Sequence, residues 1–222
     1  MKINQFIFIF LLVLAGFLSL KMVFGLFTSA ASNNGNNFIA SDSFPTKTPT
    51  PTVPITNTPT PPAQSSSPLL INEVYLLGDF KDEWVEIYNP SSSPVSVNGY
   101  RIEDDNGYDT LPDVSIPAGG YGIIKGNDSS DVIVPPPAVA IEVTNAKIGS
   151  NGFTNAGDKV VLRDETNALV DQMSYGTNTE VFSGLTPPTI SGNTLARNPN
   201  GIDTGSVTDW QIRTASIGVT NP

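Results

Sequence analysis

Hydrophobic and polar residues alternate through most of the C-terminal part of the chain. The clearest example lies within residues 83–126, where short alternating segments are separated by turns rich in proline, glycine, asparagine and serine. In its first segment Val85 and Ile87 are predicted to point to one face, and Trp84 and Glu86 to the other. This period of two is typical of half-buried antiparallel strands.

The same pattern predicts further strands, at residues 69–77, 113–116, 121–125, 139–143, 159–164 and 168–175. In the first of these, Leu69 and Ile71 are expected to share one face, and Asn72 and Val74 the other. Residues 164–167 (Asp-Glu-Thr-Asn) fit a hairpin turn. No segment here has helical periodicity over three turns. We therefore expect an all-β, immunoglobulin-like antiparallel β-sandwich over residues 69–222.

The end of this domain, residues 176–222, is expected to be a loop-rich extension. Three apolar side chains, Leu195, Trp210 and Ile212, are predicted to hold it against the sandwich. The run 197–204 contains Asn-Pro and Asn-Gly turn signals, and Arg197 and Asp203 are expected to pair across that turn. We interpret this run as structural, although it is also placed to form part of a binding rim.

A long apolar segment begins the chain, and residues 1–31 are predicted to be a signal peptide or a signal-anchor helix. Residues 6–27 are apolar except for Ser19 and Lys21. Small residues at 29–31 suit cleavage, whereas the length suits an anchor that spans the membrane. Both interpretations stay open, and both place the remainder outside the cell, either surface-anchored or secreted.

Residues 32–68 change composition abruptly and are predicted to be a disordered Ser/Thr/Pro-rich linker. The Thr/Pro repeat at 45–62 cannot bury a core, and its prolines favour an extended polyproline conformation. We interpret it as a spacer between the membrane and the domain; O-glycosylation of its threonines is a further possibility that the composition leaves open.

The amino-acid composition excludes several kinds of catalytic and metal site. The chain has no cysteine and no histidine, which excludes Cys nucleophiles, Ser-His-Asp triads and Cys/His zinc sites. The formal net charge is −10, and such a surface repels nucleic-acid backbones. We therefore expect no nucleic-acid partner and interpret the acidity mainly as a source of solubility.

The ordered series of segments resembles the lamin tail domain family, an immunoglobulin-like β-sandwich. The matching segments are 71–74 (INEV), 83–89 (EWVEIYN), 99–102 (GYRI), 116–121 (IPAGGY) and 157–162 (GDKVVL). The run 194–204 (TLARNPNGIDT) is similar to the bacterial secreted or membrane-anchored type. The resemblance covers residue 69 to about 222. It implies that the Tyr100 ring lies between the sheets and that the domain is a binding or scaffolding module without catalytic residues.

One acidic loop is a candidate calcium site. Asp104, Asp105, Asn106 and Asp109 place three carboxylates and an amide close together in sequence, and calcium takes six to eight oxygen ligands. The spacing is not that of an EF-hand, which needs a glutamate where Ser115 stands. Because Asp, Asn and Gly also form ordinary turns, a plain turn is the alternative.

A second acidic cluster, Asp82, Glu83 and Glu86, raises the question of glycoside hydrolysis, which uses two carboxylates across a cleft. Glu83 and Glu86 are an odd number of positions apart on one strand, so they point to opposite faces and make a poor pair. We expect them instead to solvate an edge and to pair with Arg101 or Lys81.

These features together predict a non-enzymatic, exported domain that binds a protein or glycan of the cell envelope, or acts as a scaffold there. Two other functions stay open. One is a calcium-dependent or carbohydrate-active hydrolase, which needs converging carboxylates in a pocket with a raised pKa. The other is a self-associating envelope or coat protein, which needs an exposed apolar patch or an open edge strand.

Overall fold

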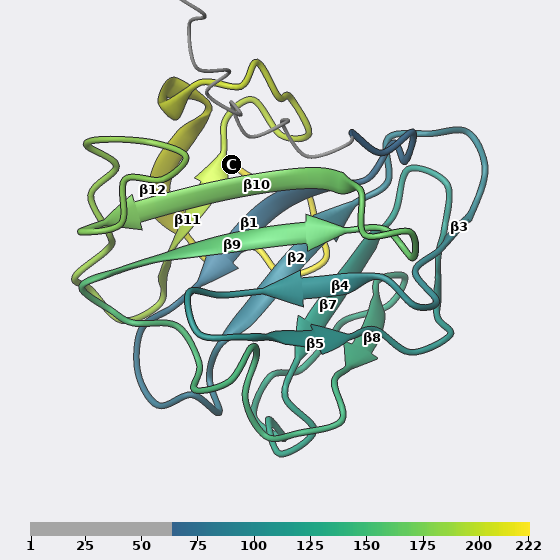
Figure 1. Ribbon diagram of the computed structural model, residues 1–222, viewed down its shortest axis with the longest axis horizontal. Coiled ribbons are helices and arrows are strands. Elements are labelled where there is room, and N and C mark those ends of the chain that lie inside the picture. The colour runs from purple at the N-terminus through teal and green to yellow at the C-terminus, as the bar shows by residue number, and fades with distance from the viewer. Residues whose placement is uncertain (1–63) are drawn as a thin grey trace, which may run out of the picture. The chain divides into compact units, whose positions relative to one another are not determined.

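A computed structural model of the protein describes residues 64–222 (Figure 1). The predicted N-terminal helix and most of the predicted linker, residues 1–63, lie outside the described residues. Within residues 64–222 there is no helix long and apolar enough to span a membrane. The elements are β1 Leu70–Tyr75, β2 Trp84–Tyr88, β3 Val95–Ser96, β4 Arg101–Glu103, β5 Tyr108–Thr110, β6 Ser115–Ile116, β7 Tyr121–Lys125, β8 Val139–Glu142, β9 Gly157–Arg163, β10 Leu169–Gly176, β11 Asn193–Arg197, the 3-10 helix η1 Val207–Asp209 and β12 Trp210–Thr214.

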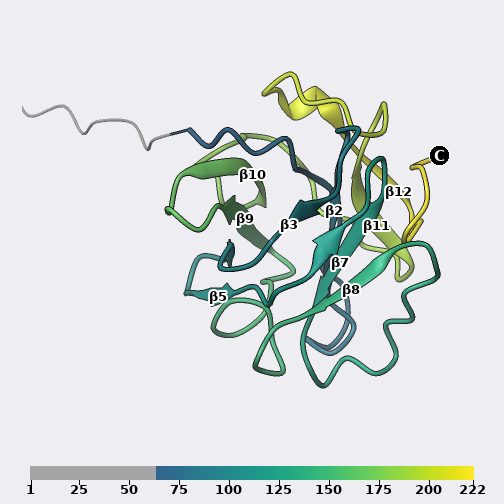
Figure 2. The same cartoon turned by 90° about the vertical axis from the view of Figure 1, so that its right-hand side faces the viewer.

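Two sheets form the layers of a sandwich, as the side view shows (Figure 2). One sheet has the strand order β12-β11-β1-β2-β7-β8 and the other β10-β9-β4-β5, while β3 and β6 form a small ribbon. Their inward side chains make one apolar cluster, and the predicted all-β sandwich is confirmed. Val85, Ile87 and Tyr100 belong to this cluster, as expected. The cluster also includes Ile71, Val74, Ile102, Ile124, Ile141, Leu162, Met173 and Leu195.

One strand departs from the predicted antiparallel arrangement. β8 pairs with β7 in parallel, with Gly122 opposite Val139 and Lys125 opposite Glu142. A parallel neighbour needs a crossover connection instead of a tight turn. The long segment of residues 126–138 supplies it, and the three prolines at 135–137 lie in that connection, outside any strand.

A bulge in β1 makes the predicted alternation of that strand wrong beyond Ile71. The register between β1 and β2 shifts between Ile71 and Glu73, so an extra residue is accommodated there. As a result Val74 lies in the same core cluster as Ile71, instead of opposite it. Asn72 and Glu73 are fully buried polar residues on the other face.

The C-terminal extension contributes two strands to the larger sheet. β11 pairs with β1, and β12 pairs with β11 at the edge. Leu195 and Trp210 are buried in the core cluster, as predicted. Ile212, predicted to pack with them, is 44% exposed on the edge strand, so that prediction is wrong.

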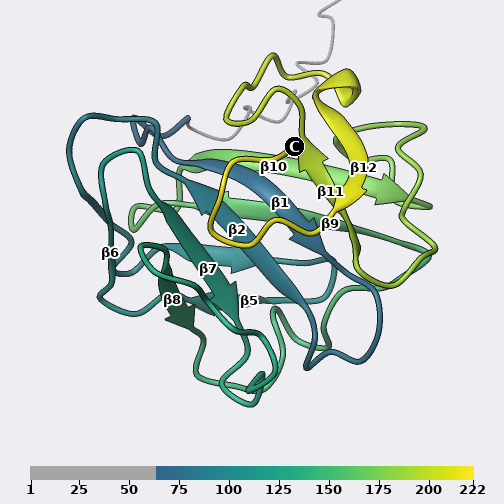
Figure 3. The same cartoon turned by 180° about the vertical axis from the view of Figure 1, so that it is seen from behind.

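Beyond β12, residues 215–222 cross the outer face of the six-stranded sheet, where Figure 3 shows them in front of β1 and β2. We call these residues the C-terminal strap. Ser216 N donates to Glu73 Oε1 at 3.0 Å and Gly218 N donates to Glu86 Oε2 at 2.7 Å. Asn221 Nδ2 donates to Arg197 O at 2.9 Å. The strap is therefore fastened to the sheet by carboxylates and an amide.

Candidate functional site

The four residues of the predicted calcium loop follow the β4 strand and run into β5. Asp104 Oδ1 accepts bonds from the backbone N–H groups of Asn106, at 2.7 Å, and Gly107, at 2.6 Å. Asp104 is 3% exposed, and its Oδ2 atom is buried without a hydrogen-bond partner among the described residues. This carboxylate therefore closes its own turn.

The other two carboxylates of the loop are directed to different neighbours. Asp109 accepts from Asn145 Nδ2 and Gly149 N, each at 2.7 Å. Asp105 lies 3.6 Å from the ammonium of Lys159 and accepts from an asparagine of a neighbouring loop. Burial raises the pKa of Asp109, while its two hydrogen bonds oppose the rise.

Over residues 64–222 no three acidic side chains converge in a way that would hold a metal ion. Calcium binding by Asp104, Asp105, Asn106 and Asp109 stays a prediction. Titration of the purified chain with calcium, followed by heat release and by the thermal midpoint, tests it directly. A site of this kind is expected to raise the midpoint at millimolar calcium, because a ligand that binds only the folded state stabilises it; an unchanged midpoint without heat would contradict it.

The second acidic cluster does not solvate an edge, and that prediction is wrong. Glu83 is 3% exposed and Glu86 is fully buried. Glu83 Oε2 accepts from Phe153 N at 2.9 Å, and Glu86 accepts from Asn72 Nδ2 at 2.8 Å as well as from the strap. Segments distant in sequence cover both carboxylates.

The two predicted bases also have other partners. Lys81 pairs with Asp128 at 2.7 Å, and the Arg101 guanidinium lies 4.6 Å from the centre of the Tyr108 ring. Among residues 64–222, neither Glu83 nor Glu86 forms an ion pair. Burial is the main cause that raises their pKa values, to about 7 for Glu83 and about 8 for Glu86.

Arg197 is the most heavily bonded side chain of the sandwich, and it is fully buried. Its guanidinium donates to Asp171 Oδ2 at 2.8 Å and to Asp203 at 3.0 Å, and lies 3.5 Å from Asp209. The guanidinium also lies 4.7 Å from the centre of the Trp210 ring. The predicted pair of Arg197 with Asp203 is confirmed, but it is one part of a larger network.

Asp171 joins the two sheets through this network. It lies on β10 of the four-stranded sheet, whereas Arg197 lies on β11 of the six-stranded sheet. Asp171 Oδ2 also accepts from Ile71 N, on β1, at 2.8 Å. Burial raises the pKa of Asp171 to about 6, against the opposing influence of Arg197.

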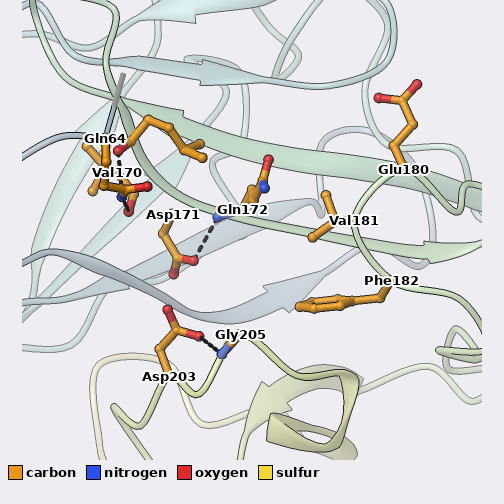
Figure 4. Close-up of a pocket in the computed structure, with 10 residues that line it drawn as sticks. Gln64, Val170, Asp171, Gln172, Glu180, Val181, Phe182, Asp203 and Gly205 are labelled. Carbon is orange, nitrogen blue, oxygen red and sulfur yellow. Dashed lines mark hydrogen bonds between the residues drawn. The ribbon is translucent and has the colours of Figure 1, made fainter. Parts of the chain in front are cut away.

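A groove of about 350 Å³ opens beside this network (Figure 4). The β10 strand forms one side, the segment of Glu180 to Phe182 the second, and the turn of Asp203 to Gly205 the third. Gln64 lies at one end, where its Nε2 atom donates to Leu169 O at 2.8 Å. The first described residues therefore already pair with β10, before the expected domain start.

The groove combines polar and apolar groups in a way that suits binding. Val181 and Phe182 form an apolar wall, and Glu180 and Asp203 supply carboxylates. The half-buried Gln172 side chain lines the groove and has no hydrogen-bond partner among the described residues. Its amide offers donors and an acceptor to a ligand.

The buried carboxylate of the groove is poorly placed for acid–base chemistry. Asp171 accepts from Arg197 and Gln172 N with one oxygen, and from Arg197 and Ile71 N with the other. A general acid or base needs a free lone pair or proton within reach of the reacting atom, and here backbone and guanidinium donors already take both Asp171 oxygens. Asp203 accepts from Arg197 and from Gly205 N, both with Oδ1. Asp171 is therefore unsuited to act as a general acid or base.

Nothing local in the sequence marks this groove. Gln172 and Val181 come from segments that are predicted only as a strand and as loop, and Asp203 comes from the turn run. The one available signal was the Arg197 run, because an arginine within an apolar-flanked stretch must find buried acceptors if it folds inward.

Comparison with known proteins agrees with the fold. The family model described as Lamin Tail Domain matches residues 62–177, a stretch that includes β1 to β10. A search of curated proteins finds no match. The strands β11 and β12, the Arg197 guanidinium and the strap lie beyond the matched stretch. With a match over more than half of its length and the sandwich expected from it, the chain belongs to the lamin tail domain family.

Proposed function

We propose that this protein is a non-enzymatic binding module, displayed outside the cell and held there by its N-terminal segment, that engages a protein or glycan of the cell envelope. Membership of an immunoglobulin-like family supports a binding role. The apolar N-terminal run and the Thr/Pro tract support export and display on a spacer.

The observation that carries the proposal is the groove beside β10. It presents the Gln172 amide, which has no hydrogen-bond partner within residues 64–222, together with carboxylates and an apolar wall, beside the buried Asp171–Arg197 pair. Polar groups fixed in position beside apolar surface are the usual composition of a ligand site. Because both Asp171 oxygens are already bonded, the groove is suited to hold a ligand and not to cleave it.

Substitution of Gln172 by arginine tests the proposal. The longer, charged side chain is expected to fill the groove and reduce the envelope material retained by the immobilised chain at least about tenfold, on the order of 1.4 kcal/mol. The measurement compares detergent-extracted envelope protein with protease-treated envelope glycan, so the retained fraction also identifies the class of ligand.

Ser115→Arg is the matched control. Ser115 is exposed on β6, so an arginine at this position adds the same charge away from the groove. It is expected to retain as much material as the unaltered chain. Equal losses in both variants, or no retention above background by the unaltered chain, would overturn the proposal. Gel filtration of all three proteins shows whether self-association accounts for the retained material.

A further inference from the structure

A second groove lies on the other side of the sandwich, on the outer face of the six-stranded sheet, the face turned to the viewer in Figure 3. Its volume is about 390 Å³. Tyr75 of β1 and Trp84 of β2 are direct cross-strand neighbours, and their rings stack with centres 6.0 Å apart and planes 9° apart. Val132 and Ile217 pack against the same aromatic pair. Trp84 is only 3% exposed beneath these side chains, so the half-buried Tyr75 supplies most of the aromatic surface that the groove offers.

Two carboxylates line this apolar groove. Asp82 precedes β2, and Asp131 lies in the long connection between β7 and β8. Neither forms an ion pair with another residue of the described part of the chain. Both are at least partly exposed. They thus offer negative charge to a molecule that enters the groove.

The nearby bases have closer partners than these two carboxylates. Lys81 pairs with Asp128 at 2.7 Å, and Lys147 lies over the Phe80 ring at 4.5 Å. The pKa of Lys81 is raised, first by Asp128 and then also by Asp79 and Asp131. This end of the domain therefore has a negative potential, which attracts cations.

Exposed aliphatic side chains flank the groove in sequence. Ile133, next to the lining residue Val132, is 77% exposed, and Ile190, next to the lining residue Ser191, is 66% exposed. Because they adjoin lining residues along the chain, these exposed side chains are available to a polypeptide that extends past the groove. A small cation would leave them uncovered, whereas a polypeptide segment would cover them.

We propose that this outer groove docks a basic segment of a partner protein, with an arginine or lysine side chain lying against the Tyr75 ring and its charged end near Asp82 and Asp131. The alkyl stem of such a side chain buries apolar surface while its head stays near the carboxylates. Contact of the cation with the Tyr75 ring adds to the attraction.

A pair of synthetic peptides tests the charge requirement. The first is Gly-Val-Arg-Val-Gly, and the second carries citrulline, which has nearly the same shape without charge, in place of arginine. The full chain is titrated with each at low salt in non-ionic detergent, and binding is followed by the indole N–H signals of its two tryptophans. We expect the arginine peptide to shift the signal of Trp84 but not that of Trp210, and to bind at least about tenfold more tightly, on the order of 1.4 kcal/mol.

Charge-matched variants test the site. Asp82→Asn combined with Asp131→Asn is expected to weaken the arginine peptide at least about tenfold. Asp113→Asn combined with Glu165→Gln removes the same charge from exposed positions elsewhere and is expected to leave the affinity unchanged. Equal loss in both double variants would show general electrostatic attraction and overturn the proposal. Equal binding of the citrulline peptide, or no shift of Trp84 at millimolar arginine peptide, would overturn it as well.

This proposal is independent of the groove beside β10. The Gln172→Arg variant is expected to bind the arginine peptide as well as the unaltered chain does, because Gln172 lines the other groove. Weaker peptide binding in that variant would show that the peptide binds in the groove beside β10, and would contradict the inference.

Discussion

Replacement of Arg197 by methionine is expected to lower the free energy of unfolding by about 3–5 kcal/mol, the loss typical when one partner of a buried ion pair is removed. The substitution retains much of the volume of the side chain but leaves Asp171 and Asp209 buried without their cation. It also removes the contact with the Trp210 ring and the bond to Ile71 O. Urea titration followed by tryptophan fluorescence measures the change.

Arg101→Met is the control, because it makes the same chemical change at a half-buried position. Arg101 stacks on the exposed Tyr108 ring and donates to Asn167 at 3.3 Å. Contacts of this kind at the surface are worth about 1 kcal/mol or less. If both variants lost the same stability, the buried network would not be the main link between the sheets.

A rise in pH from about 5 to about 9 is expected to destabilise the folded chain. Burial raises the pKa of Glu83 to about 7 and that of Glu86 to about 8, from an ordinary value of 4.5. The folded state therefore binds protons that the unfolded state has released. The resulting stabilisation is complete below pH 4.5 and is lost as the pH rises through about 7 and about 8.

The expected size is several kcal/mol, since a tenfold change in proton affinity corresponds to about 1.4 kcal/mol. In a domain of this size the thermal midpoint should fall by roughly 10 °C over that range. The lowered pKa values of Asp164 and Asp209 act in the opposite sense, but only as the pH falls below 3.8, outside the window. Thermal scans at fixed pH values across the range provide the measurement.

Glu86→Gln separates this effect from general charge repulsion. Glutamine keeps the shape of the side chain and does not titrate, so the variant is expected to show a flatter pH profile than the unaltered chain. The Glu73 carboxylate also raises the pKa of Glu86, and burial raises the pKa of Glu73 itself. A midpoint that does not differ between pH 5 and pH 9 in the unaltered chain would refute the linkage.

Sequence patterns predicted the layers of this fold better than its polar interior. Alternation located β2, β7, β9 and β10, although β2 and β7 are buried on both faces and not half-buried as the pattern predicted. The hairpin after β9 was equally local: Asn167 has a φ of 68°, a conformation that asparagine tolerates. The bulge at Asn72 could not be predicted from the sequence, because it depends on how β1 pairs with its two neighbouring strands.

The environment of the acidic residues depends on segments that are far away in the chain. Glu83 and Glu86 were expected to solvate an edge of the sheet, but Phe153 and Gly218 supply amides that donate to them. Arg197 and Asp203 are six positions apart, so their pair was predictable, whereas Asp171 is 26 positions away and on the opposite sheet. Apart from the Arg197 run, neither groove has a sequence signal, because each is formed where separate connections meet.

The central position of β1 has a kinetic consequence. Glu73 lies opposite Glu86 on one side and opposite Ala196 on the other, so β1 can acquire its second neighbour only when a stretch of more than one hundred residues has closed into a loop. Pairings between such distant parts of a chain make folding slow. During that delay one edge of β1 has unused amide and carbonyl groups, which can pair with strands of other newly made chains.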